Sequence, residues 1–469
     1  MLLEIFYFFK EENDRPYLVW QWQLLVHVCR KWRQVVLASP FRLDLRIFCS
    51  PRTPVGKNLG IWPTLPLFID FDYYINQRHG NNASCEDNIV TALEQVDRVC
   101  DVRLKVTASE LEKISTAMQN PFPVLRSLYI RSSEHGSAPV LPADFLGGSA
   151  PCLQIIHLRR ILFPALPTLL LSTSDLVTLN LLNIPASGYI SPEAMVVGLA
   201  ALPRLKSFQF YFQLASTRPD RIHPHPITRS LLPALTRFEF RGASEYLEDL
   251  ISRIDAPQLK QIYIRYLNQL VDFQIPQLPM FIDRPVGPRL TQFRYAQVTF
   301  DSDQVTLHTY CHENDASLDE LDVVTTVLCK RIDWQVSHIA QVLSHFSATL
   351  PNVVHLKLDA QLEEESQLEG TDDVEWLHLL QQVPTVQTLR VSRELAEHVA
   401  LALEDNPWEA EAQMPPSLDL IHLVGQPASS IEKFVTARQL SGRPMTVVDT
   451  AVIDTEEDFY ERVGYHVSE

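Results

Sequence analysis

The chain has 469 residues, of which 46% are hydrophobic, and its mean hydropathy is −0.04. A chain of this length and composition can bury one or more cores, which excludes global disorder. Its 40 basic and 57 acidic residues give a net charge of −17, which repels phosphate backbones and anionic lipids, so we expect neither a nucleic acid nor a membrane as partner.

Seven cysteines are scattered along the chain, and no two have the two-residue gap of a zinc-binding or redox pair. This predicts reduced thiols in a protein of the cytoplasm or nucleus, and neither a disulfide framework nor a structural zinc. No segment approaches the ~20 apolar residues of a membrane-spanning helix. The apolar start at 1–9 carries Glu4 and lacks a basic leader, so it is not expected to be a secretory signal.

The N-terminal segment predicts a small helical module. Apolar residues repeat there with the period of a helix, and a polar stretch at 11–16 separates two such faces. The faces consist of Leu2, Ile5, Phe6 and Phe9, and of Leu25, Val28, Cys29 and Trp32.

Two strings in this module resemble an F-box: Leu2-Leu3-Glu4-Ile5-Phe6, and after the loop Val26-His27-Val28-Cys29-Arg30-Lys31-Trp32-Arg33. Segments 38–45, 51–55 and 440–444 extend the resemblance over nearly the whole chain, to the large set of F-box proteins encoded by mushroom-forming fungi. F-boxes usually have a leucine–proline pair ahead of the first helical leucines, where Met1 stands here. A truncated gene model and a weakened adaptor contact are the two explanations.

The resemblance implies the substrate-recognition subunit of an SCF-type cullin-RING ubiquitin ligase. The F-box would bind a Skp-type adaptor of the cullin complex, and the rest of the chain would bind an unknown target protein. Adaptor binding is implied for Leu2, Leu3, Ile5, Phe6, Val28, Cys29 and Trp32. The alternative is a helical cap on a repeat array, in a scaffold that binds a partner protein without any ligase.

A short motif of apolar residues, called the phrase below, repeats along the rest of the chain. It consists of a proline, any residue, an aliphatic residue, two variable residues, an apolar residue, one variable residue and another apolar residue, as in Pro123–Ile130. Twelve copies, three without the proline, place the first aliphatic residue at 99, 125, 153, 176, 205, 235, 259, 290, 318, 353, 386 and 418. The steps lie near the ~20–29 residues of leucine-rich repeats and lengthen toward the C-terminus.

Each phrase predicts a short strand. Its last two apolar positions are two residues apart and therefore face one side, while the proline, which cannot donate to the ladder, starts the strand. Amphipathic helices are expected between the phrases. One begins at Ser191-Pro192-Glu193, and others have apolar stripes at Leu247, Leu250, Ile251 and Ile254, at Val336, Ile339, Leu343 and Phe346, and at Leu395, Val399 and Leu403.

Strand and helix in regular alternation predict an α/β fold: a leucine-rich-repeat-like solenoid, or horseshoe, with helices on one side of a parallel sheet and a small N-terminal α-helical, F-box-like module. We expect the F-box-like module at 1–50, a connecting segment with the first strands at 51–95, irregular leucine-rich-type repeats at 96–430, and a C-terminal helix with an acidic tail at 431–469.

No catalytic, cofactor-binding or metal-binding residues are expected, and the chain is not predicted to be an enzyme. The sequence lacks a glycine-rich phosphate-binding loop, G-x-S-x-G and H-E-x-x-H, and contains only 14 glycines. His223 and His225 lie in a proline-rich loop without a third metal ligand nearby.

Side chains that flank the apolar strand positions should face the concave surface of the solenoid. Basic residues are expected there at 103, 105, 131, 159, 237, 241, 265, 294, 357 and 390, and acidic ones at Asp101, Glu239, Glu320, Asp322 and Asp359. Such an excess of positive charge favours an acidic or phosphorylated segment of a partner, although arginine can also serve solubility.

One patch is expected at the centre of this surface. The phrases assign Arg237, Arg241, Arg265 and Arg294 to three consecutive strands, and neighbouring strands lie ~4.8 Å apart. With Tyr263, these residues would form a partner-binding patch ~10–15 Å across.

Overall fold

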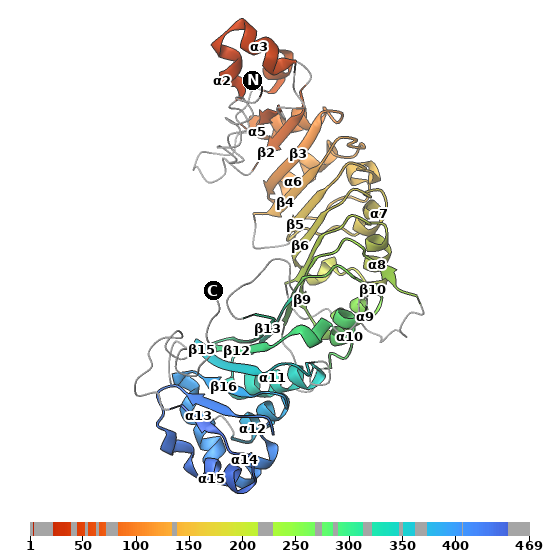
Figure 1. Ribbon diagram of the computed structural model, residues 1–469. Coiled ribbons are helices and arrows are strands. Elements are labelled where there is room, and N and C mark those ends of the chain that lie inside the picture. Colours follow the sequence, from red (N-terminus) through yellow and green to blue (C-terminus); the bar gives the residue numbers. More distant parts are fainter. Residues whose placement is uncertain are drawn as a thin grey trace. The chain divides into compact units, whose positions relative to one another are not determined.

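The computed structural model describes residues 3, 22–38, 45–51, 55–61, 65–71, 83–133, 138–213, 228–267, 274–284, 289–312, 321–346, 350–361, 373–405 and 407–448. The chain divides into two compact units, residues 1–213 with 230–235, and residues 214–229 with 236–469. Each unit combines a β-sheet with α-helices (Figure 1).

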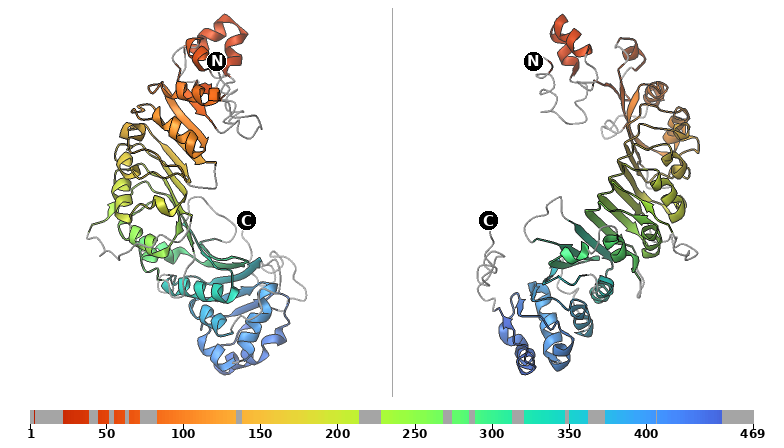
Figure 2. Two further views of the ribbon diagram at one scale, coloured as in Figure 1. Left: turned by 180° about the vertical axis from the view of Figure 1, so that it is seen from behind. Right: turned by 45° about the vertical axis from the view of Figure 1, so that its right-hand side comes forward.

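In the first unit, the described strands of the sheet are all parallel and pair in chain order. They are β1 (Ile47–Cys49), β2 (Leu67–Asp70), β3 (Val99–Val106), β4 (Ser127–Ser132), β5 (Ile155–Arg159), β6 (Thr178–Ile184) and β7 (Ser207–Phe212). The helices are α2 (Trp22–Val28), α3 (Arg30–Leu37), α4 (Val55–Ile61), α5 (Ala83–Leu93), α6 (Ala108–Thr116), α7 (Leu166–Leu170) and α8 (Pro192–Ala200). Helices α7 and α8 lie on one face of the sheet, and the views in Figure 2 agree.

The phrase forms a β-turn followed by a strand. In the copy at Pro123, the N–H of Leu125 donates to the carbonyl of Phe122, and β4 begins at Ser127. The proline thus occupies the second turn position, which suits its fixed φ. The prediction that the proline starts the strand was wrong, because Pro123 lies within the turn and three residues separate it from Ser127, where β4 begins.

The predicted alternation of the strand is confirmed. Leu128 and Ile130 are no more than 1% exposed, whereas Tyr129 between them is half-buried on the opposite face. The apolar positions therefore face the helices, and the positions between them form the open face of the sheet.

Helix starts follow from local sequence as expected. Ser191 accepts a hydrogen bond from the N–H of Ala194 at 3.2 Å, and Pro192 is the first residue of α8. Thr107 and Glu110 form a capping box at the start of α6. The helix predicted from Leu247, Leu250, Ile251 and Ile254 ends earlier than expected. Ile254 belongs to the short strand β10 (Ile254–Asp255) and not to α9 (Ser244–Ser252).

The sheet of the second unit runs in the order β9, β11, β14, β13, β12, β15, β16, β17, β18. Its strands are β9 (Arg237–Gly242), β11 (Gln261–Tyr266), β12 (Tyr295–Asp301), β13 (Gln304–Tyr310), β14 (Asp322–Leu328), β15 (His355–Gln361), β16 (Thr388–Val391), β17 (Leu420–Leu423) and β18 (Thr446–Val447). Its remaining helices are α10 (Gln277–Asp283), α11 (Ile332–Phe346), α12 (Asp373–Gln381), α13 (Arg393–Asp405), α14 (Pro407–Gln413) and α15 (Glu432–Leu440).

Strand β13 interrupts the expected parallel sheet. It pairs antiparallel with both β12 and β14, while β14 is parallel to β11 and β12 is parallel to β15. The three strands form a meander that inverts the chain order within the sheet. The expectation of a uniformly parallel sheet was therefore wrong in this unit.

The phrases assigned at 290 and 318 were placed out of register. The carbonyl of Arg294 accepts the N–H groups of Val354 and His355, as the carbonyl of Arg126 accepts those of Gln154 and Ile155 in the first unit. Arg294 is thus the residue before a strand and lies on no strand. The correct buried positions are Ala296 and Val298 in β12, and Val323 with Thr325 in β14.

One buried amide holds both ends of the meander. Gln335 of α11 is 1% exposed, and its Nε2 donates to the carbonyl of Asp301 and to that of Cys329, each at 2.7 Å. Asp301 ends β12, and Cys329 directly follows β14. Helix α11 packs against β13 and β14, so this amide fixes the meander to the helix behind it.

A buried carboxyl group links α9 to α10. Glu248 accepts the N–H of Gln277 at 2.6 Å and that of Leu278 at 3.2 Å, at the start of α10. Burial raises the pKa of Glu248 to about 8, although these two hydrogen bonds act in the opposite direction.

The raised pKa of Glu248 predicts a stability that depends on pH. Between the ordinary pKa of 4.5 and about 8, the folded state holds the proton of Glu248 more tightly than the unfolded state does. The stabilisation that protonated Glu248 gives the folded state is therefore complete below pH 4.5 and is lost as the pH rises through 8. Glu248→Gln cannot ionise and should lack that loss. Urea midpoints measured against pH should show wild type falling relative to the variant over this interval.

Glu245→Gln is the matched control, because Glu245 is exposed on the same helix. It should follow the wild-type pH profile. Parallel profiles for wild type and Glu248→Gln would contradict the assignment.

Candidate functional site

The segment 22–37 is a pair of short helices, α2 and α3. Cys29 between them is extended, with φ −159° and ψ 169°, and its Sγ accepts the N–H of Trp32 at 3.5 Å. The expectation of one continuous helical face from Leu25 to Trp32 was therefore wrong, since Cys29 ends α2 and caps α3.

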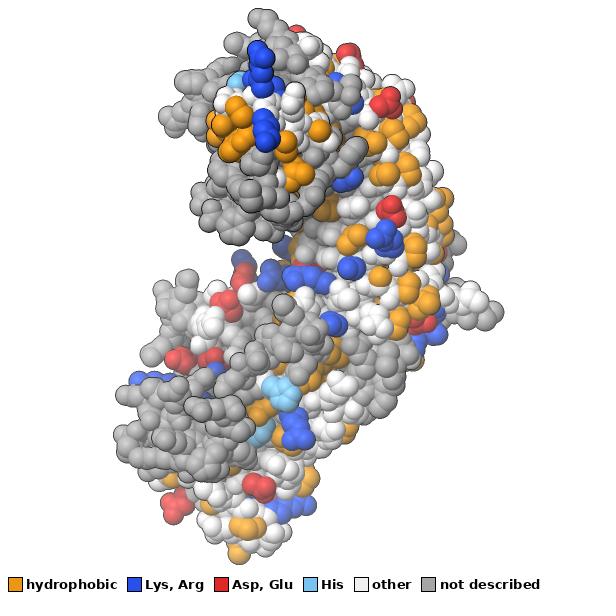
Figure 3. Space-filling view, turned by 45° about the horizontal axis from the view of Figure 1, so that its top comes forward, with side chains coloured by type: hydrophobic (Ala, Val, Ile, Leu, Met, Phe, Trp, Pro, Cys, Tyr) orange, Lys and Arg blue, Asp and Glu red, His pale blue; other side chains and the backbone are white. Residues whose placement is uncertain are grey.

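Apolar side chains of this helix pair are exposed. Leu24 is 54% and Val28 58% exposed, while Val26 and Val36 are fully buried. Figure 3 shows hydrophobic side chains beside Lys and Arg in the part of the molecule that Figure 1 labels α2 and α3. Exposed apolar side chains next to positive charge are typical of a surface that binds another protein.

The residues implied in adaptor binding are only partly described. Val28 and Cys29 are exposed, Trp32 is half-buried, and Leu3 is helical and half-buried. Leu2, Ile5 and Phe6 lie outside the described residues.

The open face of the first unit carries a row of three cations. Lys105 pairs in register with Arg131 across β3 and β4, and Arg131 with Arg159 across β4 and β5. Lys105 and Arg131 are half-buried, and Arg159 is exposed. We call Lys105, Arg131 and Arg159 the basic row. Since neighbouring strands lie ~4.8 Å apart, the row concentrates positive charge within ~10 Å at the Cα level.

An aromatic row lies beside the basic row. Arg103 stands over the ring of Tyr129 at 5.3 Å, and that ring stacks on His157 with centroids 5.5 Å apart. Burial, and then the charges of Arg159 and Arg131, lower the pKa of His157, which keeps its ring neutral near pH 7. We call Arg103, Tyr129 and His157 the aromatic row, because Tyr129 and His157 offer adjacent uncharged rings with Arg103 at one end.

Acidic side chains at this face lie to one side of both rows. Asp101 forms an ion pair with Arg46, and Asp70 pairs in register with Arg103. Both carboxylates are less than 10% exposed, so among the described residues of this face the accessible charge comes mainly from the basic side chains.

The basic row could have been found from the sequence. Its residues directly follow the third apolar position in three consecutive phrases, as Leu104-Lys105, Ile130-Arg131 and Leu158-Arg159. The sequence predicted all three on the open face, among ten basic residues. Their shared position in consecutive phrases is the signal that sets them apart.

In the second unit, the positive charge around Arg237 is balanced by acidic partners. Arg237 forms an ion pair with Glu239 and a hydrogen bond of 3.1 Å with Gln261, and it stands 5.2 Å over the ring of Tyr263. The hydroxyl of Tyr263 donates to Asp322 at 2.9 Å. These contacts offset the charge of Arg237, one of the four arginines of the expected basic patch.

The meander adds His308 to this network, with Nε2 2.6 Å from Asp322 Oδ1. Burial opposes ionisation of Asp322, but the hydrogen bonds from His308 and Tyr263 and the charges of His308 and Arg237 together outweigh it and lower the pKa of that carboxyl. Burial and the hydrogen bond to Asp322 raise the pKa of Tyr263 to about 12. The group is therefore a set of mutually satisfied polar side chains, which predicts a structural role.

The proposed patch of four arginines is not formed. Arg241 and Arg265 do pair in register on β9 and β11, but β14 and β13 stand between β11 and β12, which Arg294 precedes. At ~4.8 Å a strand, Arg294 lies ~14 Å from β11 and not on the adjacent strand. The order of strands in the meander overturns this prediction.

Histidine and basic side chains also meet farther along the second sheet. Arg390 pairs in register with Lys357 and with His422, and Lys357 Nζ lies 3.7 Å from Asp359. Burial, and then the charge of Arg390, lower the pKa of His422 to about 4. His422 is 1% exposed, and Asp359 offsets the charge of Lys357.

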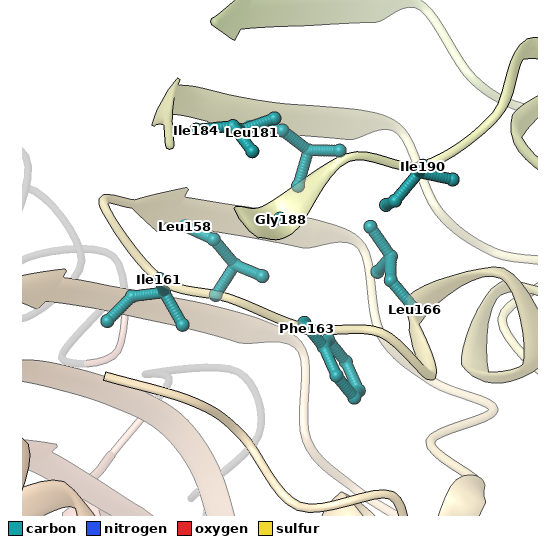
Figure 4. A pocket seen from close by; sticks show the side chains of 8 residues that line it. All are labelled: Leu158, Ile161, Phe163, Leu166, Leu181, Ile184, Gly188 and Ile190. Carbon is teal, nitrogen blue, oxygen red and sulfur yellow. The ribbon is translucent and has the colours of Figure 1, made fainter. Parts of the chain in front are cut away.

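A small pocket in the first unit offers no site for chemistry. Figure 4 shows eight residues that line it, from Leu158 to Ile190, and all of them are apolar. The cavity measures ≈ 10 Å³, about the space of one water molecule. Within the described ranges, no three His, Cys, Asp or Glu side chains gather as metal ligands. Those same ranges also contain no helix with the length and apolar character needed to cross a membrane.

No family model matches the chain, and neither does any curated protein. Among solved structures, the chain is similar to the leucine-rich repeat-containing protein LegL7 from Legionella pneumophila. The two share 15% sequence identity with a TM-score of 0.29, over 76% of this chain and 95% of that one. The architecture described above rests on strand register and hydrogen bonding alone.

Proposed function

We propose that the chain is a non-enzymatic recognition protein of the cytoplasm or nucleus that binds an acidic or phosphorylated segment of another protein. The basic row on the open face of the first unit carries this proposal. Guanidinium groups bind carboxylate or phosphate through two parallel hydrogen bonds, and the adjacent Tyr129 adds rigid apolar surface.

Charge reversal of the basic row tests this function. The triple variant Lys105→Glu, Arg131→Glu, Arg159→Glu should weaken binding of glutamate-rich or phosphoserine-containing peptides by roughly 3- to 150-fold, since three exposed ion pairs contribute ~0.2–1 kcal/mol each. Fluorescence anisotropy with labelled peptides measures the loss. Binding of wild type should also weaken with added salt.

Lys113→Glu, Arg126→Glu, Arg204→Glu is the matched control. These residues are exposed on the same unit but lie on no strand of the sheet, and the net charge changes equally. This control should bind like wild type. If both triple variants weaken binding equally, the loss is due to overall charge and not to the basic row. If reversal of the basic row leaves binding unchanged, the proposed function is refuted.

The finer proposal is that the partner is a degradation target and that α2 and α3 connect the chain to a ubiquitin ligase. In support, Val28 is exposed on α2 inside the string that resembles an F-box, and Leu24 is exposed on the same helix just before that string. The chain would then be the substrate receptor of an SCF-type ligase, with a Skp-type adaptor on the helix pair. A scaffold with a helical cap is the alternative, and it predicts no adaptor binding.

Val28→Asp separates these two roles. Placing a charge on an apolar contact surface should abolish co-purification with a fungal Skp-type adaptor, while the melting temperature stays near that of wild type because Val28 is 58% exposed. Val197→Asp is the control, since Val197 on α8 is exposed to the same extent. If wild type itself fails to bind the adaptor, even with an upstream leucine–proline extension, the scaffold is favoured.

A further inference from the structure

The spacing of the two rows constrains the conformation of the bound segment. The basic row runs across β3, β4 and β5, so its residues repeat at the ~4.8 Å distance between strands. The aromatic row runs parallel to it, two residues earlier on each of the same strands, which is ~6.6–6.8 Å along the strand. The surface is thus two short parallel stripes, one cationic and one largely uncharged.

An extended segment fits these stripes poorly. Side chains on one side of a β-strand repeat every ~6.6–6.8 Å, so three successive carboxylates would drift by ~4 Å relative to three cations spaced at ~4.8 Å. In an α-helix, side chains three or four residues apart lie ~5–6 Å from one another on one face. The helix repeat is therefore closer to the repeat of the basic row.

The width of the surface also suits a helix. A helix with its side chains is ~10–12 Å in diameter, which covers two rows spaced by ~6.6–6.8 Å. The next positions toward the strand starts are Asp101 on β3, Ser127 on β4 and Ile155 on β5. The small side chain of Ser127 stands at the centre of this line, and Asp101 is held in its ion pair with Arg46.

We infer that the partner segment is an α-helix lying across β3, β4 and β5, with carboxylates one turn apart over the basic row and an apolar stripe over Tyr129 and His157. This inference rests on the proposed function and specifies the class of its partner: an amphipathic helix whose acidic and apolar stripes are adjacent. The neutral ring of His157 is consistent with an apolar neighbour, and Arg103 lies at the β3 end of the aromatic row.

Two synthetic peptides of identical composition test the inference with the full-length protein. The first has glutamates one helical turn apart beside a leucine stripe, in an alanine-rich chain of about 20 residues that forms a helix. The second has the same residues permuted so that glutamates alternate along the chain. Circular dichroism establishes the helicity of each, and fluorescence anisotropy measures both affinities at the same salt concentration.

The helical peptide should bind about tenfold more tightly than the permuted one, because only its carboxylates reach all three cations together. Lys105→Glu, Arg131→Glu, Arg159→Glu should abolish the difference, and the control with Lys113, Arg126 and Arg204 reversed should retain it. A Tyr129→Ala variant should weaken binding of the helical peptide more than that of the permuted one, since only the helix places leucines over the ring.

The failures of the inference and of the function are distinguishable. If the permuted peptide, or an extended phosphoserine peptide, binds the basic row as tightly as the helix, then the helical geometry is overturned and recognition of acidic segments stands. If no acidic peptide distinguishes wild type from the charge-reversed basic row, both are overturned.

Discussion

One backbone carbonyl in each repeat holds the sheets in register. The carbonyl of Arg126 accepts the N–H groups of Gln154 and Ile155, the carbonyl of Gln154 accepts those of Val177 and Thr178, and the pattern recurs in the second unit. Because buried backbone groups must be paired, each repeat fixes the strand start of its neighbour to the residue. The apolar positions then face the helices, and the intervening positions align into rows across the open face. The basic row is a direct product of that alignment.

Local sequence predicted most of the strands, because the phrase encodes its own turn and its own buried face. The copy at Pro123 shows why: the fixed φ of proline suits the turn, and Leu128 and Ile130 have no alternative to burial on one side. The order of strands in the meander could not be predicted in this way. Val305 and Leu307 alternate as in any half-buried strand, but nothing in that pattern names the partner strand or its direction.

The candidate site, too, was predicted from the sequence only in part. Residues of the open face were assigned from periodicity, and the alternation of buried and half-buried positions agrees with that assignment along β3 to β5. The sequence did not show which charged residues of the open face keep their charge accessible, because that depends on the partners that each residue meets in the folded chain. The sequence shows that Arg237 is charged, but only the folded chain places Glu239 and Asp322 near it. Lys105, Arg131 and Arg159 instead line up on adjacent strands. The F-box resemblance had already implied a partner surface at α2 and α3, and the folded chain adds that Leu24 and Val28 are exposed there.

The meander has a consequence for how such a sheet can grow. Strands β14 and β12 both point in the direction of their outer neighbours β11 and β15, and β13 alone points the other way. Relative to a single strand at this place, the meander adds two strands, which is the smallest addition that restores chain polarity for the next repeat. An insertion of one antiparallel strand would give the next repeat a neighbour of opposite direction. Extra antiparallel strands therefore keep the contacts to both outer neighbours parallel only when they are added in even numbers, a parity rule for any lengthening or shortening of this sheet.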